Sequence, residues 1–310
     1  MSDVKWCRRS TRRIAKALCH RQMRISHSSV WRKMKKAGYS LRANRKRLSF
    51  RQSPHRDRQF KHIEACRREF LRAGDPVISA DAKKRELIGL FKNGGRTWSR
   101  EPTDVSTYDF PSDAKGVAIP YGIYDVARDE GFVVVGTSRN TPAFSVNAIK
   151  LWWQARGRRL YPRAKRLMIL ADAGGSNGAR AHIWKRELQR LAAKLGIKIV
   201  VAHYPTGGSK WNPVEHRLFA PISINWAAKP LVDYATVCGF IRGTTLGSGA
   251  RCRVRLDRRR WLTAKEGKEQ APHRIEPPAP GSVRASRVLP EWNYTIVPPA
   301  SRYCRRRCSS

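Results

Sequence analysis

Two short apolar runs with a helical pattern between them constrain most strongly how this chain can fold. The first run, residues 167–170, leads to Asp172 and then to a glycine-rich stretch, GGSNG. The second run, residues 197–201, follows a helical pattern at about 179–195. Apolar runs of this length next to glycine are typical of buried strands. Because the last side chain of such a strand lies at the carboxyl edge of the sheet, we expect Asp172 there.

Two further acids fit the same edge. Residues 77–79 form another apolar run that leads to Asp81, and Glu215 lies in the first turns of a helix after the strand at 197–203. Three carboxylates at one edge indicate a site for a divalent metal ion, because such ions prefer oxygen ligands. Each acid taken alone is explained equally well as a turn residue, a helix cap or an ion-pair partner. The joint placement favours the metal site.

The charge of the chain indicates its partner. Lys and Arg number 64 against 23 Asp and Glu, which gives a net charge of +41. Self-repulsion on this scale opposes compaction unless a polyanion binds. Basic residues occur throughout the chain, so nucleic acid is favoured over an anionic membrane surface. No apolar stretch approaches the roughly 20 residues that a membrane span requires.

The sequence argues against zinc and nucleotide cofactors. None of the seven cysteines forms a Cys-x-x-Cys pair, and Cys304 and Cys308 lack a second pair of ligands, so we expect reduced thiols. Gly174, Gly175 and Gly178 are not followed by Gly-Lys-Ser/Thr, which excludes the common phosphate-binding loop. With no signal peptide, the expected location is the bacterial cytoplasm, in association with the nucleoid.

The first 45 residues predict a helix-turn-helix segment. Two amphipathic patterns occur there, with Ser26 placed to cap the second helix and Gly38 to end it. Residues 27–37 would be the recognition helix. The alternative is an ordinary helical hairpin with a solvated basic face. The residues expected to face DNA are His27, Ser28, Ser29 and Arg32.

The remaining chain divides into three parts. Residues 46–74 read as a basic linker and a helix, residues 75–243 as a catalytic domain, and residues 244–310 as an Arg/Pro-rich region expected to be largely disordered. The predicted element order of the catalytic domain is that of the α/β ribonuclease H-like fold, a mixed five-stranded sheet flanked by helices. Its elements are strands 77–81, 86–91 and 131–137, helix 141–156, strand 167–172, helix 179–195, strand 197–203 and helix 213–226, with a long loop at 92–124.

Several long motifs carry a resemblance to one family. They are VISADAKKRELIGLFKNGGRTW, AIPYGIYDVARDEGFVVVG, LMILADAGGSNGARAHIWKRELQRLA, HYPTGGSKWNPVEHRLFAPISINW and EWNYTI. The chain resembles the Rhodopirellula-type DDE transposases, also called the ISAzo-thirteen insertion-sequence group, from about residue 6 to 240 and again at 291–296. It departs from the family in lacking a further N-terminal region, so we expect a truncated N-terminus. Residues 246–290 also depart, as a compensated frameshift would produce, which leaves the activity of this copy open.

The resemblance implies a DDE triad that matches Asp81, Asp172 and Glu215 one for one. It also implies metal-dependent DNA strand cleavage and strand transfer at the ends of an insertion sequence. The expected cofactor is a pair of Mg²⁺ (or Mn²⁺) ions, with Asp81 bridging both ions and the other two acids holding one each. Asn212 and His216 match positions beside the glutamate and are candidates for supporting the acids.

Double-stranded DNA is the expected partner, both as the terminal repeats of the element and as its target, and a homo-oligomer would form on it. Four basic residues close in sequence to the acids are candidate phosphate contacts, with a solvated role as the alternative: Lys83, Lys84, Lys210 and Arg217. Two other functions stay open. One is a DNA-binding remnant that does not cut, and the other is a ribonuclease H-like nuclease that does not join strands.

Overall fold

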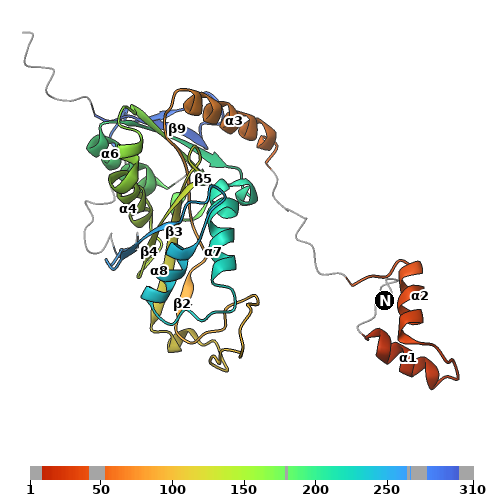
Figure 1. Cartoon of the computed structure of the whole chain (residues 1–310). Coiled ribbons are helices and arrows are strands. Elements are labelled where there is room, and N and C mark those ends of the chain that lie inside the picture. Colours follow the sequence, from red (N-terminus) through yellow and green to blue (C-terminus); the bar gives the residue numbers. More distant parts are fainter. Residues whose placement is uncertain (1–8, 42–52, 179–180, 264–265, 267–277, 300–310) are drawn as a thin grey trace, which may run out of the picture. The chain divides into compact units, whose positions relative to one another are not determined.

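The structure is a computed structural model, and it describes residues 9–41, 53–178, 181–263, 266 and 278–299. The chain forms two compact units, Met1–Phe50 and Arg51–Ser310. The larger unit is a mixed sheet with helices on both faces (Figure 1). Among the described residues, no helix is both long and apolar enough to span a bilayer.

The described part of the N-terminal unit contains two helices, α1 (Thr11–Cys19) and α2 (His27–Lys36). The side chain of Ser26 accepts a hydrogen bond from the Ser29 N–H at 3.1 Å. This bond satisfies one of the N–H groups that the first turn of a helix leaves without an intrahelical partner. The predicted cap is therefore confirmed. Gly38 follows α2 with a φ of +81°, as predicted for the residue that ends the helix.

Five strands form the centre of the sheet. They are β1 (Val77–Ala82), β3 (Gly116–Asp125), β4 (Glu130–Gly136), β5 (Arg166–Asp172) and β6 (Lys198–Tyr204). Their order is β4–β3–β1–β5–β6. β3 is antiparallel to β1 and β4, whereas β1, β5 and β6 are parallel to one another. This is the predicted ribonuclease H-like arrangement.

Further strands extend this centre on both sides. They are β2 (Glu86–Ile88), β7 (Arg253–Asp257), β8 (Val283–Ala285) and β9 (Asn293–Ile296). β7 lies parallel to β4 at one edge, β9 lies antiparallel to β6 at the other, and β8 pairs with β9. β2 pairs with β3. The sheet of the described residues thus has nine strands rather than the predicted five.

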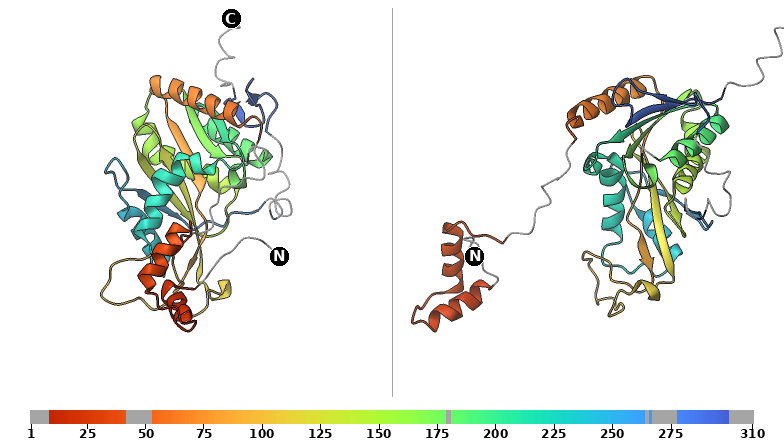
Figure 2. Two further views of the ribbon diagram at one scale, coloured as in Figure 1. Left: turned by 90° about the vertical axis from the view of Figure 1, so that its right-hand side faces the viewer. Right: turned by 180° about the vertical axis from the view of Figure 1, so that it is seen from behind.

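Helices cover both faces of the sheet (Figures 1 and 2). One face carries α4 (Pro142–Trp152), the π-helical turn η2 (Trp153–Gly157), α5 (Arg158–Leu160) and α6 (His182–Leu195). The other carries α3 (Arg56–Arg72), the π-helical turn η5 (Glu215–Phe219), α7 (Ala220–Asn225) and α8 (Tyr234–Gly243). Short 3-10 turns lie at η1 (Pro111–Asp113), η3 (Gly175–Asn177) and η4 (Ser209–Trp211).

The buried core follows from strand alternation. Successive side chains of a strand point to opposite faces of the sheet. Ile78 and Ala80 of β1 therefore belong to the core beneath α4 and α6. Val77 of the same strand, together with Met168 and Leu170 of β5, belongs to the core beneath α3. The strands are apolar on both faces because both faces are covered.

The second central strand was placed wrongly by sequence. The predicted strand at 86–91 is only the short β2, and all but the last residue of β3 lies in the segment 92–124, which was not expected to hold a strand. Pro120 disguises β3, since proline is rare in central strands. Its carbonyl accepts the Lys83 N–H at 2.8 Å, just beyond the last residue of β1. The N–H and C=O of a strand residue point to the same side, so an N–H at position 120 would also face Lys83, which lies outside β1. Its absence therefore breaks no hydrogen bond of β1.

The prediction that residues 244–310 are largely disordered is wrong for β7, β8 and β9. β7 reads RVRLD, in which arginines alternate with Val254 and Leu256, and these two pack against the core beneath α8. Tyr294 and Ile296 of β9 are buried. The arginines gave this region its disordered composition, yet alternation with apolar residues is the pattern of a half-buried strand. Other parts of that prediction lie outside the described residues, namely 264–265, 267–277 and 300–310.

We expect the amide hydrogens of β9 to exchange with solvent more slowly than those of β7. β9 is hydrogen-bonded by β6 and β8, whereas β7 pairs with β4 along one side, and an edge strand leaves half of its backbone groups unpaired. Hydrogen–deuterium exchange of the full chain, read by mass spectrometry, measures this order. Exchange across residues 293–296 as fast as in an unfolded peptide would contradict the assignment of β9.

Candidate active site

The pairing of β1 with β5 brings Asp81 and Asp172 side by side. The parallel register joins Ser79 to Leu170, and each aspartate lies two residues further along its strand. Side chains two residues apart point to the same face of a sheet. Both carboxylates therefore project from the carboxyl ends of adjacent strands, on the face that carries α3 and η5.

Glu215 comes to this edge through the seating of η5 on β3. Gly122 of β3 pairs with Asp81 of β1. A Cβ atom on Gly122 would lie 2.4 Å from Phe219 Cε1 and 2.9 Å from Leu218 Cδ2. The absence of a side chain thus lets η5 press directly on the strand beside Asp81. Glu215 begins η5, about one turn before Phe219.

Ser79 ties the segment that leads into η5 to β1. Its buried hydroxyl donates to Asn212 Oδ1 and accepts the Val214 N–H at 2.9 Å. Ser79 is two residues before Asp81, so the strand that carries one acid also fixes the start of the helix that carries another. Sequence reasoning missed this residue. Its signal is a polar side chain inside the apolar run VISAD.

Two asparagine side chains engage the aspartates. Asn177 Nδ2 donates to Asp81 Oδ1 at 3.3 Å, and the Ala82 N–H donates to the same oxygen at 2.7 Å. Asn212 Nδ2 donates to Asp172 Oδ1 at 3.4 Å. Both asparagines are completely buried. Asn212 was proposed from sequence as a support for the acids, whereas Asn177 was missed, although a buried polar residue inside the glycine-rich loop marks it.

Burial raises the pKa of both aspartates, and repulsion from neighbouring carboxylates raises that of Asp81 further. For Asp81, burial is the largest cause and the charge of Asp172 the next, and together with Glu215 they raise the pKa to about 7 against the hydrogen bond from Ala82. Burial also raises the pKa of Asp172, and the hydrogen bond from Asn212 lowers it. A carboxylate whose pKa is raised by neighbouring carboxylates, as that of Asp81 is, is expected where like charges share a site.

Neighbouring charges of both signs act on the pKa of Glu215. Burial and then Asp172 raise its pKa, whereas His216 and Lys83 lower it. His216 is exposed, and its charge reaches Glu215. The two residues therefore lie close enough for His216 to support the acid electrostatically, which is the part that sequence reasoning suggested for it.

The donor set of the site fits a divalent metal ion, although the acids do not surround a common point. Among the residues that the structure describes, no three His, Cys, Asp or Glu side chains are gathered closely enough to hold one ion together. Oxygens of Asp81 and Asp172 instead accept hydrogen bonds from Asn177 and Asn212. Charges act on one another well beyond ligand distance, so Asp172 can raise the pKa values of Asp81 and Glu215 at this spacing. The three acids share one edge and one electrostatic field.

An exposed aromatic residue with two cations lies beside Asn212. Trp211 is 40% exposed. Lys210 Nζ lies 4.1 Å from the centre of its ring, and the guanidinium carbon of Arg56, at the start of α3, lies 4.4 Å from it. Cations over an indole face are attracted by its quadrupole. We refer to Arg56, Lys210 and Trp211 as the Trp211 cluster.

The other proposed phosphate contacts lie in different surroundings. Lys83 is paired with Glu86 at 2.7 Å and lies over the Trp226 ring. Lys84 and Arg217 are exposed. In the N-terminal unit, the four residues suggested to face DNA lie within residues 27–32 of α2, where the Arg32 guanidinium donates to Ser29 Oγ at 3.3 Å.

A buried hydrogen-bond chain holds the backbone of Asp172. His203 Nδ1 lies 2.9 Å from the Asp172 carbonyl oxygen, and His203 Nε2 lies 3.0 Å from Tyr294 Oη. Because a carbonyl only accepts, Nδ1 carries the proton and Nε2 accepts from the Tyr294 hydroxyl. That hydroxyl in turn accepts from Trp184 Nε1 at 2.9 Å. Burial lowers the pKa of His203 to about 4. The ring is therefore neutral at pH 7, as this series of hydrogen bonds requires.

Gly122→Ala should destabilise the fold by about 1–3 kcal/mol, because its Cβ would overlap Phe219 and Leu218. Gly239→Ala is the matched control. Gly239 lies in α8 with nothing within 4 Å of an added Cβ, and alanine favours helices, so stability should stay equal or rise by up to about 1 kcal/mol. Urea denaturation followed by circular dichroism measures both. Equal stability of the two variants would contradict the close seating of η5.

Asp81→Asn should change how stability depends on pH. The pKa of Asp81 in the folded chain exceeds its ordinary value of 3.8. The folded chain therefore binds the extra proton between about pH 4 and 7, and stability falls as pH rises through that window. Without divalent metal, the unfolding free energy of wild type minus that of Asp81→Asn should decrease from pH 4 to pH 7.

Asp233→Asn supplies a control whose stability difference should stay flat from pH 4 to 7, because the pKa of Asp233 is shifted in the opposite direction. Asp233 caps α8, and its pKa is lowered by hydrogen bonds from Thr236. Its stabilising contribution is present above its unfolded pKa and is lost as pH falls below that value. A difference for Asp81→Asn that stays flat from pH 4 to 7 would show that Asp81 is not buried among like charges.

Comparison with known proteins gives the chain its relatives. Among solved structures it is similar to a Mos1 transposase paired-end complex with left transposon end, with TM-score 0.46 and 13% identity. It is similar also to a pre-cleavage Mos1 transpososome (TM-score 0.45, 14% identity) and to a Mos1 mariner paired end complex with Mn (TM-score 0.44, 14% identity). Each match covers 74% of this chain and 64% of the Mos1 chain.

The family comparison covers nearly all of the sequence. No curated protein sequence matches the chain. Residues 1–298 match the family model described as the Rhodopirellula transposase DDE domain. The match runs through the acids and through β7, β8 and β9, the strands that sequence reasoning had not found. The chain therefore belongs to the Rhodopirellula transposase DDE domain family.

Proposed function

We propose that this protein is an insertion-sequence transposase that cuts DNA strands at the ends of its element and joins them to target DNA. Asp81, Asp172 and Glu215 are the proposed active-site acids. The observation that carries the proposal is the β1–β5 register, which sets the two aspartates level at one edge of the sheet. Membership of a DDE transposase family supports the reaction class.

The proposed cofactor is a pair of Mg²⁺ or Mn²⁺ ions. Carboxylate oxygens are the ligands that such hard cations prefer. When bound, two ions activate the attacking oxygen and stabilise the charge that develops on the leaving oxygen. Asp81, Asp172 and Glu215 are the residues that would hold these ions. Asn177 and Asn212 would orient the aspartates through the hydrogen bonds described above.

The proposed reaction has two displacements at phosphorus. Water attacks a phosphodiester at the element end, and the bond to the 3′ oxygen breaks to leave a 3′-hydroxyl. That hydroxyl then attacks a phosphodiester of the target, forms a new bond to phosphorus and releases a hydroxyl of the target strand. Neither displacement links DNA to the protein, so no serine or tyrosine nucleophile is assigned.

The proposed DNA contacts surround the acids and occupy α2. The Trp211 cluster lies next to Asn212 and offers two cations to a phosphate near the cut. Residues 27–32 of α2 would read the terminal repeat, with His27, Ser28 and Arg32 exposed. A reaction that joins two ends to one target favours a homo-oligomer on DNA.

Asp172→Asn should reduce strand cleavage by about 100-fold or more, because several kcal/mol of charge stabilisation at the reacting phosphate depend on the metal ligands. DNA affinity should stay within about twofold of wild type, since no phosphate contact is removed. The assay uses the purified full chain, labelled element-end DNA and Mg²⁺. Asp104→Asn, a change of equal charge at an exposed loop residue, should cleave as wild type does.

The products of the same assay separate the candidate functions. Joined strands support the transposase. Binding without cleavage by the wild-type chain would indicate a remnant that occupies element ends, and cleavage of an RNA–DNA hybrid without joining would indicate a ribonuclease H-like nuclease. Full cleavage by Asp172→Asn would remove this aspartate from the active site.

A further inference from the structure

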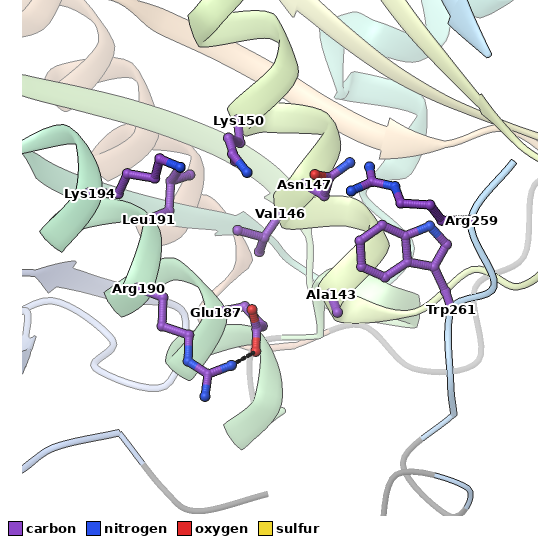
Figure 3. Close-up of a pocket in the computed structure, with 10 residues that line it drawn as sticks. All are labelled: Ala143, Val146, Asn147, Lys150, Glu187, Arg190, Leu191, Lys194, Arg259 and Trp261. Carbon is purple, nitrogen blue, oxygen red and sulfur yellow. Dashed lines mark hydrogen bonds and ion pairs between the residues drawn. The ribbon is translucent and has the colours of Figure 1, made fainter. Parts of the chain in front are cut away.

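A basic pocket lies on the face of the sheet opposite to the acids (Figure 3). It has a volume of about 270 Å³ and is formed by α4, α6 and the segment after β7. Residues seven apart on each helix line it, which is two turns along one stripe. The lining residues are Ala143, Val146, Asn147, Lys150, Glu187, Arg190, Leu191, Lys194, Arg259 and Trp261.

Two of the four cations in this pocket are neutralised by carboxylates. Arg190 Nη1 pairs with Glu187 at 2.8 Å, the contact drawn in Figure 3. Arg259 forms a two-pronged pair with Asp257, at 2.8 and 2.7 Å, and lies over the ring of Trp261. Their side chains are thus held in place before any ligand arrives.

The other two cations line the same pocket from different helices, Lys150 from α4 and Lys194 from α6. Among the described residues, no carboxylate forms an ion pair with either ammonium group. Burial lowers the pKa of Lys150, and the positive charges of Lys194 and Arg259 lower it further. Like charges held this close repel, and an anion placed between them would convert the repulsion into attraction.

We propose that this pocket is a second DNA-binding site, in which Lys150 and Lys194 hold a backbone phosphate on the α4–α6 face. The shared chemistry is that of a phosphate group, because ammonium groups act on it as point charges and need no fixed ligand plane. Val146 and Leu191 form an apolar floor, and both are buried. The floor and the fixed arginines shape a seat for one compact anion.

The phosphate bound in this pocket is assigned to the backbone of duplex DNA. A chain with a net charge of +41 is organised to bind a polyanion. Only this choice of polyanion rests on the proposed function. The site itself rests on the pair of lysines and does not touch the acids, because Asp81 projects from the opposite face of β1 to Ile78 and Ala80, which pack beneath α4 and α6.

The test compares Lys150→Gln/Lys194→Gln with a control that removes the same charge. The control is Lys165→Gln/Lys198→Gln, two exposed lysines at the amino ends of β5 and β6. Fluorescence anisotropy of the full chain with labelled duplex DNA gives affinity between about 50 and 200 mM salt. We expect the pocket variant to bind about three- to tenfold more weakly than the control, with a salt slope smaller by about 1 for each phosphate that the variant no longer binds.

Two outcomes would overturn the proposal, and the melting temperature shows whether the pocket variant is still folded. The first is equal affinity and equal salt slope for the two variants. The second combines two results. Inorganic phosphate raises the melting temperature of wild type but not of the pocket variant, and the pocket variant binds DNA as tightly as the control. Together these results would indicate a site for free phosphate rather than for DNA. The melting temperature of the pocket variant should equal or exceed that of wild type, because the change removes repulsion. Binding is read without cleavage, so an inactive catalytic site does not affect the result.

Discussion

The parallel pairing of β1 with β5 is the constraint on which the site depends. It sets Asp81 level with Asp172, and the other parts of the site are held by β1 and by its antiparallel neighbour β3. Ser79 fastens the approach to η5, and Gly122, paired with Asp81, gives η5 room to settle on the sheet. A slip of one residue would turn Asp81 to the opposite face. The geometry of the site is therefore a property of strand register rather than of a flexible loop.

Like charges are gathered at two places on opposite faces of this sheet. At the carboxyl edge, burial and two neighbouring carboxylates, Asp172 and Glu215, raise the pKa of Asp81 to about 7. Between α4 and α6, Lys150 and Lys194 lie close together in a chain whose net charge is already strongly positive. In both places the repulsion is an energetic cost to the folded chain that an ion of opposite sign relieves. The first place suits metal cations and the second a phosphate.

The sequence was sufficient where local pattern and tertiary structure agree. Asp172 follows a continuous apolar run before glycines, and both the strand and the position of the acid at its end could be predicted from that run. Pro120 hid β3 because local preference and tertiary role conflict there. The contact of Gly122 with Phe219 joins residues far apart in the chain, and no local pattern records such a contact. Asn177 could be noticed as a polar residue among glycines, but its bond to Asp81 depends on the fold.

A buried series of hydrogen bonds runs from Trp184 through Tyr294 and His203 to the Asp172 carbonyl, and it has a consequence for protein synthesis. All three acids precede residue 220, yet Tyr294 is supplied by β9, near the end of the sequence. A ribosome-bound chain that has not yet released β9 carries the acids without the contacts beneath one of them. The hydrogen bonds that hold the Asp172 backbone from beneath can therefore form only after the last strand of the sheet has been translated.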